Sequence, residues 1–258
     1  MKSLWNNFKV AFAMFSKIPM PQADWKKENM KYMFCFFPFI GTVIGGFTLL
    51  AAYVLERYGF DVDFGAVVLT LIPVIVTGGI HVDGLLDTSD AMSSWQERSR
   101  RLEILKDSNA GAFAVITACV YFLCWFGAYS QIISRGSVEA LFVLSLGFMV
   151  SRCFSGIGVI MLPKAKADGT VAEFSRNSAD KVTRNVLIVY LMILFVLMAL
   201  IHPVYGVAAF LGAALIFFYY RNMALKYFGG TTGDLSGCFL CLCEVGMALI
   251  LAIVSNFC

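Results

Sequence analysis

The ten residues HVDGLLDTSD, positions 81–90, directly follow an apolar run that is long enough to enter a membrane. If this segment is helical, Asp83, Asp87 and Asp90 stand at positions i, i+4 and i+7 and share one face within roughly 60°. Three carboxylates this close repel one another and require a cation. Ligands that offer only oxygen favour a hard ion such as Mg²⁺. The segment therefore predicts a magnesium site; the alternative is a solvated acidic helix face.

The composition of the chain is that of a membrane protein. Hydrophobic residues make up 59% of its 258 residues and charged residues only 14%, against roughly a quarter in soluble domains. We therefore expect an all-α, polytopic integral membrane protein, formed as a single domain over residues 1–258. Apolar runs of roughly 17–25 residues predict about seven transmembrane helices. These runs cover residues 32–55, 64–80, 110–133, 140–162, 186–201, 204–220 and 235–257.

The fifth and sixth of these runs are separated only by His202 and Pro203, which predict a tight turn. A single long helix kinked at Pro203 is the competing interpretation. The sequence alone thus leaves seven or six transmembrane helices.

Residues 1–20 predict an amphipathic helix that lies at the membrane interface. Apolar side chains recur there at helical spacing, and polar side chains occupy mostly other faces. Lys17 interrupts the apolar stretch, which is also too short for a signal peptide. The apolar positions are Leu4, Trp5, Phe8, Ala11, Phe12, Phe15 and Ile18.

The basic residues predict the orientation of the chain. With the N-terminus in the cytoplasm, 17 of the 20 lysines and arginines fall in cytoplasmic segments. Only Arg57 and Arg135 fall outside, and Arg152 lies within a span. Because short cytoplasmic loops are enriched in basic residues, we expect the N-terminus and the Asp-rich loop at 81–109 to be cytoplasmic.

Two further cytoplasmic segments carry cations suited to phosphate binding. Lys106 and Asp107 follow a basic stretch before the third span, and Lys164 and Lys166 precede a glycine turn. Lysines at such a turn can bind phosphate. The alternative for both segments is that their positive charges serve only to orient the chain in the membrane.

The sequence GGTTGD at 229–234 leads into the last span. A glycine-rich turn before a helix offers backbone N–H groups to an anion, and Thr232 adds a hydroxyl. Asp234 is a fourth candidate metal ligand or base. His81 is a candidate base as well, although a structural role is equally compatible with its position beside two glycines.

Two charges, Arg152 and Glu244, lie within predicted spans. Arg152 lies ten residues before Leu162, and Glu244 lies ten residues after Asp234. Leu162 and Asp234 mark the cytoplasmic ends of the two spans. At 1.5 Å per residue both are roughly 15 Å deep. An isolated charge there costs at least about 2.5–3.5 kcal/mol, so we expect the two to pair. The alternative is that Arg152 faces a water-filled cavity and contacts a phosphate.

Four segments and a following glutamate resemble the signature of the cobalamin synthase (adenosylcobinamide-GDP ribazoletransferase) family. They are TGGIHVDGLLDTSD at 77–90, RLEILKDS at 101–108, SR at 151–152, GGTTGD at 229–234, and Glu244. The resemblance covers nearly the whole chain in the same order. Two positions depart from the family pattern: Ala91 replaces an expected glycine, and Cys241 an expected carboxylate.

The resemblance implies transfer of the adenosylcobinamide phosphate from adenosylcobinamide-GDP to α-ribazole or its 5′-phosphate, with release of GMP. It implies that Asp83, Asp87 and Asp90 hold Mg²⁺ and that one of them, or His81, accepts the ribose proton. It also implies a multi-pass protein of the bacterial inner membrane, in contact with lipid and not with nucleic acid. Whether the protein forms a homo-oligomer is left open. The substrate-binding candidates are Lys106, Asp107, Arg152, Lys164, Lys166, Thr232, Asp234 and Glu244.

Two alternatives belong to other families. A CDP-alcohol phosphotransferase runs similar chemistry, but its signature has Ala-Arg soon after the first Asp-Gly and a fourth Asp four residues after the third. Here Leu85 and Leu86 follow the Asp-Gly, and Ser94 stands at the fourth Asp position. A transporter would carry charges near the midplane of broken helices, where only Arg152 and Glu244 qualify.

Overall fold

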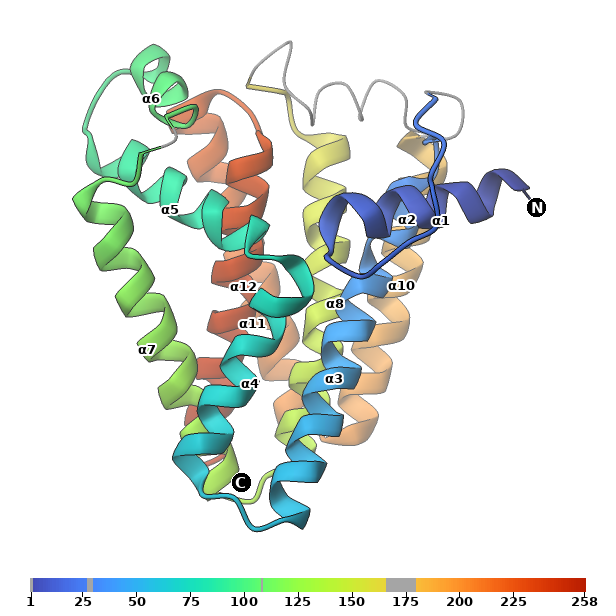
Figure 1. The fold of residues 1–258 in the computed structure, drawn as a ribbon, viewed down its shortest axis with the longest axis vertical. Helices are drawn as coiled ribbons and strands as arrows, with labels where there is room; N and C mark the ends of the chain where they lie inside the picture. Colours follow the sequence, from blue (N-terminus) through green and yellow to red (C-terminus); the bar gives the residue numbers. More distant parts are fainter. Residues whose placement is uncertain (1, 27–29, 108, 166–179) are drawn as a thin grey trace.

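The computed structural model describes residues 2–26, 30–107, 109–165 and 180–258. Every element within these ranges is helical, which confirms the predicted fold class (Figure 1). In chain order the elements are α1 (Lys2–Phe15), α2 (Met33–Phe36), α3 (Pro38–Arg57), α4 (Val62–Thr77), α5 (Ile80–Ser93), α6 (Arg98–Ile104), α7 (Ala112–Ser134), α8 (Val138–Met161), α10 (Asp180–Ile201), α11 (Pro203–Met223), the π-helical η2 (Ala224–Phe228) and α12 (Gly233–Val254).

The long helices form one bundle (Figure 1). Six helical segments of the described chain are long and apolar enough to cross a membrane, and the α4–α5 pair makes a seventh if it counts as one bent span. The predicted number of spans is therefore confirmed. Since α4 is apolar and α5 carries the acidic motif, we treat α4 as the spanning part of this pair and α5 as lying outside the spans.

Two consecutive glycines separate α4 from α5. Gly78 (φ 67°) and Gly79 (φ 81°) both adopt the left-handed conformation, which ends α4 and turns the chain by 94°. The backbone N–H of Lys17 donates to Val76 O at 2.8 Å, and the Lys17 side chain fills the space that a Cβ on Gly78 would need. Within the segment 81–109, the chain is helical from Ile80, directly after the glycines, so the acidic motif lies on α5.

The α10–α11 connection is the predicted tight turn. His202 is extended (φ −155°, ψ 114°), and Pro203 opens α11, where its missing N–H costs nothing. The His202 imidazole accepts the N–H of Tyr205 at 3.3 Å. Two separate helices thus replace the single kinked helix of the competing interpretation.

The helix α1 covers Lys2–Phe15 of the predicted interfacial segment. Of its predicted apolar face, Ala11 and Phe12 are buried against the bundle, whereas Leu4 and Trp5 are exposed. The helix runs across the bundle near the end where α6 lies (Figure 1). Its insertion into a membrane interface stays a prediction.

The core depends on close contact between α3 and α8. A Cβ on Gly41 would lie 2.2 Å from Phe148 O, and one on Gly45 would lie 2.4 Å from Ser145 O. Small residues at such positions let two transmembrane backbones touch. This contact fixes α8, which carries Arg152, at the centre of the bundle.

Candidate active site

The acidic face of α5 is positioned by its contact with α12. A Cβ on Gly84 would lie 2.6 Å from Asp234 O, and one on Gly237 would lie 3.1 Å from His81 O. The two backbones therefore touch. This approach brings Asp234, at the first turn of α12, beside the aspartates of α5.

The carboxylates of this region interact electrostatically. The pKa of Asp87 is raised to about 6, first by burial and then by neighbouring negative charges. Those charges belong to Asp83, Asp234, Asp90 and Asp107. The structure thus brings together all the aspartates that the sequence analysis selected.

Asp90 has a structural role that the sequence analysis missed. Its Oδ2 accepts the N–H of Gly111 at 2.6 Å, and its Oδ1 accepts the N–H of Ala114 at 2.9 Å. Both oxygens thereby satisfy donors at the N-terminus of α7, where a negative charge is also favourable. A Cβ on Gly111 would lie only 2.7 Å from the Asp90 carboxylate. The available sequence signal for the start of α7 was Gly111, which directly precedes an apolar run.

The residues fit Mg²⁺ in their chemistry, but not as a ready three-ligand cage. Among the described residues no group of three or more His, Cys, Asp or Glu side chains is arranged to hold a metal. Mg²⁺ is commonly held by one or two carboxylates, with water and substrate phosphates completing its shell. Asp83 and Asp87 fit this pattern, because their carboxylates make no hydrogen bond or ion pair within the described chain. Metal binding by the three aspartates stays a prediction.

Lys164 is engaged by the end of α8. Its ammonium donates to Val159 O and, at 2.7 Å, to Leu162 O, so it caps the last carbonyls of that helix. The adjacent backbone pairs with the glycine-rich turn, since Thr231 N donates to Pro163 O at 2.8 Å. Two of the three ammonium hydrogens are thus used within the protein. Lys166 lies outside the described residues.

The turn at 229–234 is held in place by its own hydroxyls. Thr232 accepts the N–H of Leu235 at 3.2 Å and caps α12, while its hydroxyl lies 3.4 Å from Asp234 Oδ2. Thr231 Oγ1 lies 2.6 Å from the hydroxyl of Tyr220. Anion binding by this turn stays a prediction.

The helix α6 places a cation beside the turn, and Lys106 and Asp107 follow the C-terminal end of this helix. Lys106 and Asp107 are exposed there, and Asp107 accepts the backbone N–H of Asn109 at 3.0 Å. The guanidinium of Arg98 lies directly over Gly229, where a Cβ would meet its Cζ at 2.0 Å. Arg98, one of the 17 basic residues that the sequence analysis counted only as cytoplasmic charge, is thus a candidate phosphate-binding residue.

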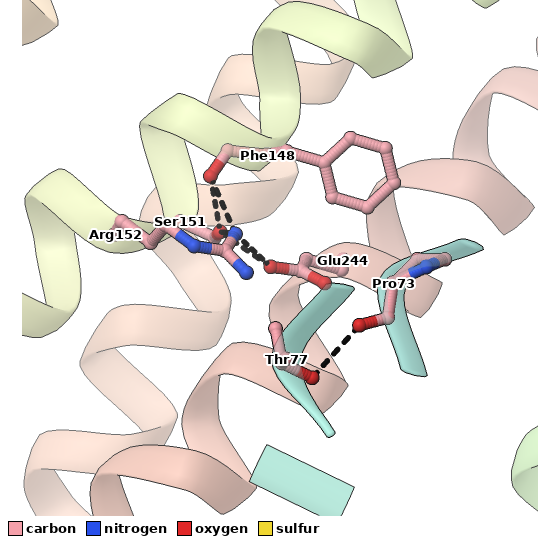
Figure 2. Close-up of polar contacts among 6 residues, drawn as sticks. All are labelled: Pro73, Thr77, Phe148, Ser151, Arg152 and Glu244. Atoms are coloured by element: carbon pink, nitrogen blue, oxygen red, sulfur yellow. Dashed lines mark hydrogen bonds and ion pairs between the residues drawn. The ribbon is translucent and has the colours of Figure 1, made fainter. Parts of the chain in front are cut away.

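Arg152 and Glu244 form the predicted ion pair. Arg152 Nη1 lies 2.6 Å from Glu244 Oε1, and both side chains are at most 5% exposed (Figure 2). Ser151 Oγ donates to Glu244 Oε1 at 2.8 Å, and Arg152 Nη1 also donates to Phe148 O at 2.7 Å. Their matching depth had predicted this pair. Contact of either residue with substrate stays a prediction.

His81 is a buried residue at the start of α5. Burial, and then the positive charge of Arg152, lower its pKa to about 3, so the imidazole is neutral. Its ring lies 6.3 Å from that of Phe37, measured between centroids. A catalytic role for His81 stays a prediction.

Together, the fold and the site define a polytopic helical membrane protein with a carboxylate-rich site at one end of its bundle. The model of the cobalamin-5-phosphate synthase family matches residues 7–252, and the chain belongs to this family. The resemblance of the sequence motifs is thereby confirmed, and the other two families are disfavoured.

Curated relatives agree with this membership. The chain is 41% identical to an adenosylcobinamide-GDP ribazoletransferase of Lachnoclostridium phytofermentans, over 98% of this chain and 94% of the relative. It is 31% identical to one of Desulfitobacterium hafniense, over 95% and 94% of the two chains. It is 28% identical to one of Clostridium perfringens, over 98% of this chain and 100% of the relative. No solved structure matches this chain.

Proposed function

We propose that this protein is a transferase that joins the two halves of a cobamide. The cobinamide phosphate of adenosylcobinamide-GDP passes to a ribose hydroxyl of α-ribazole or its 5′-phosphate, and GMP leaves. The observation that carries this proposal is the meeting of the acidic face of α5 with Asp234 of α12, in a chain whose relatives bear the name of this activity. A carboxylate cluster of this kind suits a reaction at a pyrophosphate.

The first requirement of the reaction is charge neutralisation. A pyrophosphate under attack accumulates negative charge on its leaving and non-bridging oxygens, and bare carboxylates would repel it. We propose that Asp83 and Asp87 hold Mg²⁺, which neutralises that charge when bound. Arg98 and Lys106 add positive charge at the same end of the bundle.

The second requirement is removal of a proton from the acceptor. The ribose oxygen forms a bond to the inner phosphorus, the bond from that phosphorus to the GMP oxygen breaks, and the hydroxyl proton must leave. With Asp83 and Asp87 assigned to the metal, Asp234 on the facing helix is the carboxylate proposed to accept it. Asp90 holds the start of α7 in place.

The orientation is also part of the proposal. We propose that the end of the bundle with α6 and the acidic site faces the cytoplasm of a bacterial inner membrane. The basic residues support this, since 17 of 20 fall in the segments assigned to that side. Arg135 contacts Asn256 near the C-terminus, at the opposite end (Figure 1).

One assay tests the function directly. Purified membranes are incubated with adenosylcobinamide-GDP and α-ribazole, with Mg²⁺ or with a chelator, and GMP is quantified by chromatography. We expect GMP to form only with Mg²⁺, and membranes that contain Asp87→Asn serve as the control. Absence of GMP with folded protein contradicts the proposal, and release of CMP from CDP-diacylglycerol would indicate the CDP-alcohol alternative.

A further inference from the structure

A pocket of about 210 Å³ lies directly beside the acidic site. It is enclosed by α1, the segment around α2, α5, α8 and α12, and Asp83 and Asp234 lie at its edge.

The walls of the pocket suit a flat apolar group. Phe15, Phe34 and Phe37 contribute aromatic rings, and Val159 and Leu240 contribute aliphatic side chains. Pockets that enclose a whole drug-sized ligand have volumes of roughly 300–1,000 Å³. This pocket therefore holds one ring system of a larger molecule, not all of it.

Only a few polar groups inside the pocket are available to a ligand. The hydroxyl of Ser236 is used by the protein, since it donates to Thr232 O at 2.9 Å. His81 is only 8% exposed and makes no hydrogen bond with any described residue. Because His81 lines the pocket, its imidazole is available to form a hydrogen bond with a ligand.

We propose that this pocket binds the bicyclic aromatic base of the acceptor nucleoside, with His81 donating a hydrogen bond to a ring nitrogen. The inference rests on the proposed function. A base seated here directs its ribose toward Asp83 and Asp234, where the hydroxyl must react. The corrin of the donor is too large for 210 Å³, and guanine would bury several polar edges against phenylalanines.

A variant that fills the pocket tests this assignment. Val159→Phe places a ring in the space of the base, while Val120→Phe, on α7 and 54% exposed, is the matched control outside the pocket. The measurement is the Kd of detergent-purified full-length protein for α-ribazole, from the fluorescence of the base and without donor. We expect Val159→Phe to raise this Kd by roughly 10- to 100-fold, the loss expected when a ring is no longer buried. The control should match the wild type.

The nature of the base provides a second measurement. An α-ribosyl benzimidazole without the two ring methyl groups should bind the wild type about tenfold more weakly than α-ribazole. If Val159→Phe does not fold, Val159→Leu also narrows the pocket and should reduce this preference. His81→Phe should weaken the binding of both nucleosides by the same factor, because it removes the hydrogen bond but not the apolar walls.

The outcomes separate this inference from the proposed function. If the wild type releases GMP but the Kd for α-ribazole is unchanged by filling the pocket, the base binds elsewhere and this inference is wrong. If Val159→Phe instead weakens the binding of GMP and leaves the Kd for α-ribazole unchanged, the pocket binds the donor. If the wild type releases no GMP and does not bind α-ribazole, both proposals fail.

Discussion

Arg152 Nη1 lies 2.6 Å from Glu244 Oε1 and joins α8 to α12 within the bundle (Figure 2). Ser151 adds a hydrogen bond to the same carboxylate oxygen, at 2.8 Å. Both charges are buried, so each depends on the other for compensation. In the same view, the hydroxyl of Thr77 donates to Pro73 O just before the α4–α5 turn (Figure 2). The ion pair thus holds α12, whose first turn carries Asp234, against α8.

The ion pair gives the first prediction. Arg152→Met and Glu244→Met should each lower the yield of folded protein, because each leaves a buried charge without compensation; the cost of breaking a buried pair is about 3–5 kcal/mol. The double Met variant should recover much of the loss. Gel filtration in detergent measures the folded fraction. A double variant no better than the single variants would show that the two charges are not coupled.

The second prediction concerns the proposed metal ligands. Asp87→Asn preserves the shape of the side chain but removes a charge that the proposal assigns to Mg²⁺. GMP release should fall by at least about a hundredfold, or about 3 kcal/mol of transition-state stabilisation, while membrane insertion is unaffected. Steady-state rates at limiting Mg²⁺ test this. Near-normal turnover of the variant would exclude Asp87 as a ligand.

Asp90 is expected to behave differently, and this is the third prediction. Since its oxygens accept the N–H groups of Gly111 and Ala114, Asp90→Ala should destabilise the protein by about 0.5–2 kcal/mol, the usual cost of losing a helix cap. Thermal unfolding in detergent measures this loss, with Asp87→Asn as the control that keeps the cap. Equal unfolding temperatures for Asp90→Ala and the wild type would argue against the capping role.

The fourth prediction follows from the raised pKa of Asp87. The pKa of about 6 in the folded protein exceeds the ordinary aspartate value of 3.8, so folding disfavours the charged form. Without metal, this residue therefore destabilises the protein above pH 6; the penalty decreases as the pH falls below 6 and is lost near the ordinary pKa of 3.8. The unfolding temperature in chelator should rise accordingly between pH 7.5 and pH 5, and the rise should be smaller in Asp87→Asn. Protons and Mg²⁺ compete for this carboxylate, so activity should fall over the same range.

The fifth prediction concerns topology. In a chain without its native cysteines, a cysteine at position 99 in α6 should react with an impermeant thiol reagent only when the cytoplasmic side is accessible. A cysteine at position 137, between α7 and α8, should react in intact cells. Cys258 is exposed and must be removed first. Labelling of position 99 from outside would reverse the orientation.

Local pattern in the sequence was sufficient for much of this structure. The apolar runs predicted the transmembrane helices, because burial in lipid requires continuous apolar segments whatever their neighbours. The depth of Arg152 and Glu244 predicted their pairing, because an isolated charge is costly in the bilayer and only these two lay at that depth. The spacing of the aspartates likewise predicted an acidic helix face.

Tertiary structure decided what each polar side chain contacts. Sequence spacing could not show that Asp90 caps α7 or that Lys164 caps α8, because a hydrogen bond depends on where separate helices end in space. The pocket beside Asp83 is built from five segments that are distant along the chain. Periodicity specifies which face of a helix is buried, whereas the partner of that face is determined by the packing of the whole bundle.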